Sequence, residues 1–144
     1  MEQKVTSSVF TAELKNLAAI RNFVEEVLSK FQVPPDIVSD FIQSVDEAAS
    51  NIMLHGYKGQ PGSIEIEIYR EEAVVTVRLR DRAPLFDPTG HPEPDITLPI
   101  EKRPFGGMGI YLIRQFMDEM HYSVTLQGGN ELSLVRKIDN PNHS

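Results

Sequence analysis

The chain has 144 residues, of which 40% are hydrophobic and 24% charged, the size and composition of one globular domain. It has no cysteine, which excludes disulfides, zinc–thiolate sites and thiol nucleophiles. No apolar run approaches the roughly 20 residues that a membrane span needs. The 21 acidic and 14 basic residues give a formal net charge of -7, which argues against nucleic acid or an anionic membrane as the main partner. We therefore expect a cytoplasmic protein.

The first half of the chain predicts one strand followed by two helices. Residues 5–14 alternate loosely between apolar and polar types, which indicates a strand. Apolar residues then recur at a helical period over residues 14–31, until Pro34-Pro35 interrupts the pattern. Pro35 suits the first turn of a second helix, whose apolar stripe runs from Val38 to Met53. We expect this helix to end near His55-Gly56, where glycine can cap it.

The second half predicts a hairpin, a long loop, a third helix and two closing strands. Residues 64–69 and 75–80 alternate strictly and flank a polar turn, so they predict a hairpin with one solvent-exposed face. Between residues 81 and 105 lie six of the ten prolines, which indicates a long irregular loop of the kind that often forms a functional lid. A helix then begins at Gly106, and strands are expected over residues 122–126 and 132–138.

These elements predict the fold class. Three helices on one face of a mixed, mainly antiparallel sheet make a two-layer α/β sandwich.

Three polar residues of the second predicted helix share one side. Glu47, Asn51 and His55 are spaced i, i+4 and i+8, so at about 100° per residue they lie together, away from the apolar stripe. One interpretation is an ordinary solvated helix face. The other is a binding site, because Ala48 and Leu54 indicate packing on this side and because carboxylate and amide oxygens can hold a hydrated divalent cation.

Asp81 ends the core-facing side of a predicted strand. It continues the alternation of Val75, Val77 and Leu79, and buried carboxylates are rare without a partner. Asp81 either turns outward at the start of the loop or accepts a hydrogen bond from a ligand's amino group at the floor of a pocket.

A glycine-rich run precedes the third predicted helix. Gly106-Gly107-Met108-Gly109 is either a flexible hinge or a place where backbone N–H groups approach phosphate oxygens at a helix N-terminus. It is not a Walker A loop, because no Gly-Lys-Ser/Thr follows. His91 and His121 have no partners at metal-ligand spacing, so we expect neither to bind a metal.

Taken in chain order, these features resemble a known family. Glu47-x-x-x-Asn51 on a helix, Asp81 after a strand, a lid and Gly106-Gly107-Met108-Gly109 opening a helix resemble the Bergerat-fold (GHKL) ATPases, which include DNA gyrase and the histidine kinases. Residues 46–57 resemble the N-box of one branch, the bacterial anti-sigma-factor serine kinases, and residues 81–88 are similar to its first glycine box.

The resemblance covers roughly residues 5–138. It implies a single histidine-kinase-like ATPase domain over residues 1–144, with an irregular ATP lid at about 81–105. This chain departs from the pattern at Ala83 and Pro84, which stand where many relatives have glycine, and in a short, proline-rich lid.

The resemblance also implies a role for each motif residue. Asn51 would coordinate Mg²⁺ bound to the ATP phosphates, and Asp81 would accept a hydrogen bond from the adenine amino group. Glu47 would be the general base that takes a proton from the attacking hydroxyl. The other residues expected at the nucleotide are Ala83, Gly106, Gly107, Met108 and Gly109.

Three functions follow as hypotheses. The first is an ATP-dependent serine/threonine protein kinase and anti-sigma regulatory factor, which binds a sigma factor and phosphorylates a small anti-sigma-factor antagonist. The second is an ATP/ADP-binding partner-switching module without kinase activity, and the third is a scaffold without nucleotide. The presence of Glu47, Asn51 and Asp81 argues against the scaffold, and Glu47 favours the kinase. The resemblance further implies a homodimer.

Overall fold

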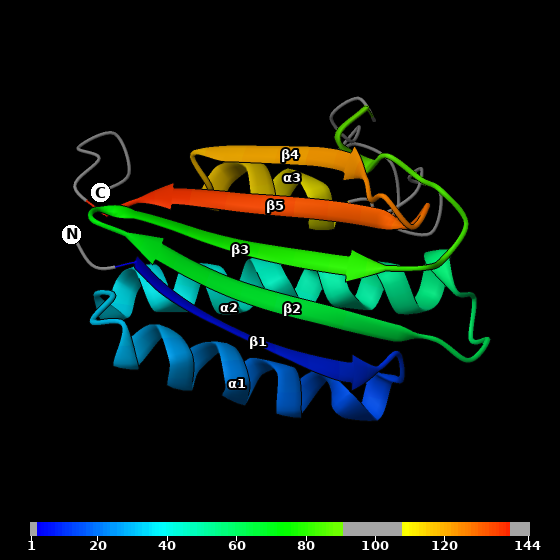
Figure 1. The fold of residues 1–144 in the computed structure, drawn as a ribbon, viewed down its shortest axis with the longest axis horizontal. Helices are drawn as coiled ribbons and strands as arrows, with labels where there is room; N and C mark the ends of the chain where they lie inside the picture. The colour runs from blue at the N-terminus through cyan, green and yellow to red at the C-terminus, as the bar shows by residue number, and fades with distance from the viewer. Residues whose placement is uncertain (1–2, 91–107, 139–144) are drawn as a thin grey trace.

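Residues 3–90 and 108–138 are described by the computed structural model, in which five strands form one sheet and three α-helices cover one of its faces (Figure 1). The strands are β1 (Gln3–Thr11), β2 (Ser63–Glu71), β3 (Val74–Asp81), β4 (Glu119–Val124) and β5 (Asn130–Lys137). The helices are α1 (Leu17–Lys30), α2 (Pro35–Asn51) and α3 (Met108–Phe116). Shorter helical segments are η1 (Leu14–Asn16), η2 (Ile52–Gly56) and η3 (Pro88–Gly90).

The sheet has the order β1-β2-β3-β5-β4, and each of these neighbouring pairs is antiparallel. The helices α1 and α2 connect β1 to β2, and α3 precedes β4, so that α2 lies between α1 and α3 (Figure 1). The predicted two-layer α/β sandwich is therefore confirmed. The sheet positions the site because the ends of β3 and β5 meet beside the C-terminal end of α2.

Most predicted elements lie close to the observed ones. The helix expected from residue 14 begins as the 3-10 segment η1, and the third helix begins at Met108 rather than at Gly106. Gly106, Gly107 and residues 91–105 of the expected lid lie outside the described residues. The closing strands start two or three residues earlier than expected, because Glu119 already pairs with Val135 and Asn130 already pairs with Asp81.

The core lies between the sheet and the helices. The alternation that predicted the hairpin directs Ile66 of β2 and Val77 of β3 toward the helices, where both are fully buried. Phe41 of α2 is fully buried against them. On the opposite face of the sheet, Arg80 forms ion pairs with glutamates of β2 and β5, as expected for a solvent-exposed face.

The second helix ends in a π-helical turn. The backbone N–H of Tyr57 donates to the carbonyl of Ile52 at 2.8 Å, an i to i+5 bond, and η2 follows Asn51 directly. The Tyr57 hydroxyl donates to the Ser63 carbonyl at 2.7 Å and accepts the Arg82 N–H at 2.8 Å. Tyr57 therefore ties the end of this turn to the start of β2 and the end of β3. π-Helical turns of this kind are often found at functional sites.

A buried arginine joins the two layers at the other end of β5. Arg136 continues the core-facing alternation of Leu132 and Leu134, and it is only 3% exposed. Its Nη1 donates to Oδ2 of Asp40 on α2 and to the carbonyl of Phe116 at the end of α3, both at 2.7 Å. A buried charge of this kind is tolerated because it is paired and hydrogen-bonded.

We expect the substitution Arg136→Ala to lower the free energy of unfolding by about 3–5 kcal/mol, because it leaves the Asp40 carboxylate without its partner. Lys30→Ala is the control, since Lys30 pairs with Glu26 and both side chains are largely exposed. It should cost about 0.5 kcal/mol or less. Urea denaturation followed by circular dichroism measures both, and equal losses would show that the buried pair does not stabilise this fold.

Candidate functional site

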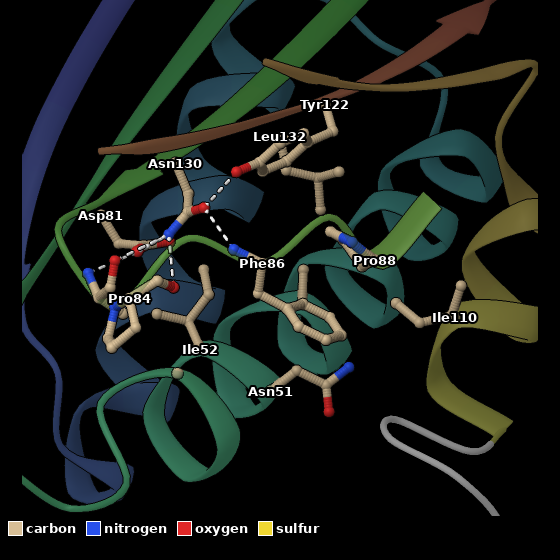
Figure 2. Close-up of a pocket in the computed structure, with 13 residues that line it drawn as sticks. Asn51, Ile52, Asp81, Pro84, Phe86, Pro88, Ile110, Tyr122, Asn130 and Leu132 are labelled. Atoms are coloured by element: carbon tan, nitrogen blue, oxygen red, sulfur yellow. Dashed lines mark hydrogen bonds between the residues drawn. The ribbon is translucent and has the colours of Figure 1, made fainter. Parts of the chain in front are cut away.

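A pocket lies where the ends of β3 and β5 approach α2, η2 and α3 (Figure 2). Its polar lining residues are Asn51, Asp81, Tyr122 and Asn130. Its apolar wall includes Ala48, Ile52, Phe86, Ile110 and Leu132. A concave, mainly apolar site with a few convergent polar groups is the usual form of a small-molecule site.

Asp81 lies in the wall of this pocket. It is the last residue of β3 and is 7% exposed. Its Oδ1 accepts hydrogen bonds from the Ala83 N–H at 2.9 Å and from Nδ2 of Asn130 at 2.8 Å. Burial raises the pKa of Asp81, and these two hydrogen bonds act in the opposite direction. Of the two sequence interpretations, the structure places Asp81 inward.

Asn51 faces the pocket from the last position of α2. Its Nδ2 is buried and has no hydrogen-bond partner among the described residues. Unpaired buried polar atoms are rare in folded proteins, and a bound ligand is one way of satisfying them. The amide also carries an oxygen, which is the type of ligand that Mg²⁺ prefers.

Glu47 lies one turn before Asn51 on α2 but is not a lining residue of the pocket. It is partly buried, and this burial, with the adjacent Asp46 as a smaller cause, raises the pKa of its carboxyl group. Asp46 itself pairs with Arg21 of α1, with Nη1 and Oδ1 2.6 Å apart. A half-buried carboxylate with a raised pKa is a stronger base than an exposed one.

The π-helical turn separates His55 from Glu47 and Asn51. His55 and Leu54 are both exposed, and neither lines the pocket. The expected packing of Leu54 on this side was wrong, because η2 changes the angle by which successive residues turn about the axis.

Ala83 is buried in the pocket wall beside η2. A Cβ atom placed on Gly56 would lie 3.1 Å from the Ala83 Cβ, so glycine at position 56 allows the segment after β3 to approach η2 closely. Met108 and Gly109 lie in the first turn of α3, while Gly106 and Gly107 lie outside the described residues.

Asn130 is a site residue that sequence reasoning missed. It is 7% exposed at the start of β5 and pairs with Asp81 across the sheet. Its Nδ2 also donates to the carbonyls of Ala83 at 3.1 Å and Pro84 at 3.4 Å (Figure 2). The sequence could have indicated it, because Asn130 stands two residues before Leu132 and so continues the core-facing alternation of the last strand with a polar residue.

Tyr122 and Phe86 complete this wall. Oδ1 of Asn130 accepts the Tyr122 hydroxyl at 2.6 Å and the Phe86 N–H at 3.0 Å. Figure 2 shows the Phe86 ring pointing into the pocket toward Asn51. No sequence pattern identified Tyr122 or Phe86 as a site residue, because both take part in the site through contacts with Asn130.

The space left in the pocket is about 50 Å³. Sites for small organic molecules usually measure roughly 300–1,000 Å³. The Phe86 ring takes up part of the pocket (Figure 2). The backbone that follows Phe86 is bound to α3, because Nη2 of Arg114 donates to the Thr89 carbonyl at 2.6 Å.

The described ranges contain no cluster of three His, Asp or Glu side chains that could hold a metal ion by themselves. Mg²⁺ usually keeps several waters and takes only one or two protein ligands beside substrate phosphates, so Asn51 fits this type of site. Within the same ranges, no helix is long and apolar enough to cross a membrane.

Comparison with known proteins gives consistent results. An anti-sigma F factor from Bacillus cytotoxicus is 28% identical over 145 aligned positions, which cover 92% of each chain. A protein named serine-protein kinase RsbW from Bacillus thuringiensis is 29% identical over 113 positions, which cover 76% of this chain and 71% of that protein.

A solved structure shares the fold. The crystal structure of the RsbU and RsbW domains of Rv1364c from Mycobacterium tuberculosis superposes with a TM-score of 0.65 and 15% sequence identity. The match covers 96% of this chain and 33% of that chain, so this chain corresponds to one part of the larger protein. The sequence profile described as the histidine kinase-like ATPase domain matches residues 10–136, from β1 into β5. The chain therefore belongs to the histidine kinase-like ATPase domain family.

Proposed function

We propose that this chain is an ATP-dependent serine/threonine protein kinase and anti-sigma regulatory factor, which binds a sigma factor and phosphorylates a small antagonist of that regulation. The observation that carries the proposal is one pocket in a histidine kinase-like ATPase fold. The buried carboxylate of Asp81 lies on one wall, and on another lies the amide of Asn51, whose nitrogen has no hydrogen-bond partner in the described part of the chain. The names of the two Bacillus relatives support the choice of partners.

Asp81 is suited to recognise adenine. Within the described chain, both hydrogen bonds that it accepts go to Oδ1, which leaves Oδ2 for the amino group of the base. Because the carboxylate is buried, a hydrogen bond to it would be stronger than in water. Ala48, Ile52 and Leu132 supply the apolar surface that a purine ring would contact.

Asn51 is suited to the phosphate end of the nucleotide. Its amide oxygen would hold a Mg²⁺ ion, which when bound neutralises part of the phosphate charge. Its Nδ2 is a buried donor that has no hydrogen-bond partner among the described residues. The backbone N–H groups of Gly106, Gly107, Met108 and Gly109 complete the proposed phosphate site.

Glu47 is the proposed general base. As the serine oxygen of the antagonist attacks the γ-phosphorus, the Glu47 carboxylate accepts the hydroxyl proton and the bond from the γ-phosphorus to ADP breaks. Its raised pKa suits this task, because a stronger base accepts the proton more readily. We place this reaction in the cytoplasm, in a homodimer that binds neither nucleic acid nor membrane directly.

A second candidate is a partner-switching module that binds ATP or ADP without transferring phosphate. One observation favours it: Glu47, the proposed general base, does not line the pocket. The two candidates differ in whether γ-phosphate reaches an antagonist protein.

The substitution Asp81→Asn should weaken ATP binding by about 1.5–3 kcal/mol, because a charge-assisted hydrogen bond to the adenine amino group is lost. Inosine triphosphate, which has a carbonyl oxygen in place of that amino group, should lose no affinity. Isothermal titration calorimetry with both nucleotides measures the difference. An unchanged preference for ATP would remove Asp81 from adenine recognition.

The same variant should be at least as stable as the wild type at pH 7. Because burial raises the pKa of Asp81, the folded chain holds this proton more tightly than the unfolded chain. The resulting stabilisation is complete below the pKa that Asp81 has in the unfolded chain. It is lost as the pH rises through the higher pKa that Asp81 has in the folded chain. Asparagine keeps the oxygen that accepts both hydrogen bonds without the buried charge, and urea denaturation at pH 7 provides the control for folding.

Magnesium should strengthen ATP binding, and Asn51→Ala should remove most of that gain because the amide oxygen is the proposed protein ligand. Gln43→Ala, an exposed amide on the same helix, is the matched control and should keep the gain. Calorimetry with and without Mg²⁺ measures both variants. If the wild type and Asn51→Ala gain equally from Mg²⁺, the ion is held elsewhere.

Glu47→Gln should keep ATP affinity but slow phosphate transfer by at least about 100-fold, because it removes the general base. In the wild type, transfer should fall as the pH is lowered toward the raised pKa of Glu47, since only the carboxylate can accept the proton. Glu26→Gln, largely exposed on α1, is the control. Labelled γ-phosphate is followed from ATP to a serine of the antagonist. If a bound antagonist receives no phosphate from the wild type, the partner-switching module is the better description.

A further inference from the structure

Asn130 is the residue through which the polar wall of the pocket is connected. It contacts Asp81 at the end of β3, the backbone of residues 83–86 and Tyr122 on β4 (Figure 2). These groups come from positions that lie 8–49 residues away in the chain. Asn130 therefore brings together the acceptor of the site, the segment that bounds it and the adjacent strand.

The chemistry of its neighbours fixes the orientation of the Asn130 amide. The Phe86 N–H can only donate, so the oxygen end of the amide must face it. The carbonyls of Ala83 and Pro84 can only accept, so the nitrogen end must face them. The Tyr122 hydroxyl, which can rotate, donates to the oxygen end and so supports this orientation.

The same orientation restricts the carboxylate of Asp81. Nδ2 of Asn130 and the Ala83 N–H both donate to Oδ1, which holds the carboxylate plane and turns Oδ2 away from these donors. A lysine or arginine in place of Asn130 would also hold the carboxylate, but it would form an ion pair and weaken attraction for a ligand donor. A neutral amide orients Asp81 and leaves its negative charge available.

We propose that Asn130, oriented by Tyr122, is a positioning residue for base recognition: it holds the Asp81 carboxylate by one oxygen so that the other oxygen meets the amino group of the nucleotide base. The inference rests on the proposed function of Asp81 as the adenine acceptor and extends it to two residues on β4 and β5. Asn130 acts through Asp81, and its connection to residues 83–86 keeps the segment that carries Phe86 in register with that carboxylate.

The test compares affinities for ATP and inosine triphosphate by calorimetry. Asn130→Ala should reduce the preference for ATP by at least about tenfold, the scale of a charge-assisted hydrogen bond that is no longer aligned. Tyr122→Phe removes one donor to Asn130 but keeps both hydrogen bonds to Asp81. The preference of this variant for ATP over inosine triphosphate should therefore fall by only about threefold. Tyr69→Phe, on the outer face of β2 beside Arg78, is the matched control and should leave the preference unchanged.

A second measurement requires no nucleotide. The titration of Asp81, followed through the ¹³C resonance of its carboxyl carbon, should move to higher pH in Asn130→Ala, because Asn130 supplies a hydrogen bond that lowers this pKa. Tyr69→Phe should not move it. Tyr122→Phe, which keeps the amide in place, serves as the test of nucleotide preference if Asn130→Ala does not fold.

The outcomes separate the two proposals. If the wild type does not prefer ATP to inosine triphosphate, adenine recognition by Asp81 is wrong. The positioning role of Asn130 in base recognition is then wrong too, even if the Asp81 titration moves in Asn130→Ala. If the wild type prefers ATP and the folded Asn130→Ala variant keeps both that preference and the Asp81 titration, the positioning role is overturned while the proposed function stands.

Discussion

The site depends on one hydrogen bond between two buried polar side chains on neighbouring strands. Asp81 ends the core-facing side of β3, and Asn130 begins the core-facing side of β5, in register with it. Each occupies a position where the alternation calls for an apolar residue, and each would be costly to bury without the other. Their pairing allows a carboxylate to lie at this end of the core-facing side of the sheet.

The π-helical turn η2 brings the second half of the site to this pair. It follows Asn51 directly and ends at Gly56, and Tyr57 fixes it to the first residue of β2 and to Arg82 after β3. The ring of Tyr57 fits because residue 62 is glycine, where a Cβ would lie within 2.2 Å of its Cε1 atom. The distance between Asn51 and Asp81 is therefore set by packing at the edge of the sheet, and not by helix geometry alone.

The two ends of β5 use buried polar groups for different purposes. At one end, the Arg136 charge is balanced by Asp40 and by the carbonyl of Phe116, which joins three elements of the core. At the other end, Asp81 has neutral partners and Asn51 has an unpartnered amide nitrogen within the described chain. The Arg136 charge serves the packing of the core, whereas polar groups that line a pocket and keep unused hydrogen-bonding capacity are suited to binding a ligand.

The sequence by itself determined the layers, the family and three of the polar positions. Period-two alternation located the hairpin and placed Asp81 in its core-facing series, and helical spacing placed Glu47 one turn before Asn51, because both periodicities are local properties of the backbone. The sequence left two directions open for the Asp81 side chain, and the structure places it inward. The roles of these residues remain predictions. Only the tertiary structure decided the π-helical turn, the exposure of His55, the insertion of Phe86 and the connections of Asn130. Several of the contacts involved join groups far apart in the sequence, such as Tyr57 and Arg82, 25 residues apart, or Asp81 and Asn130, 49 residues apart, and no local pattern encodes such contacts.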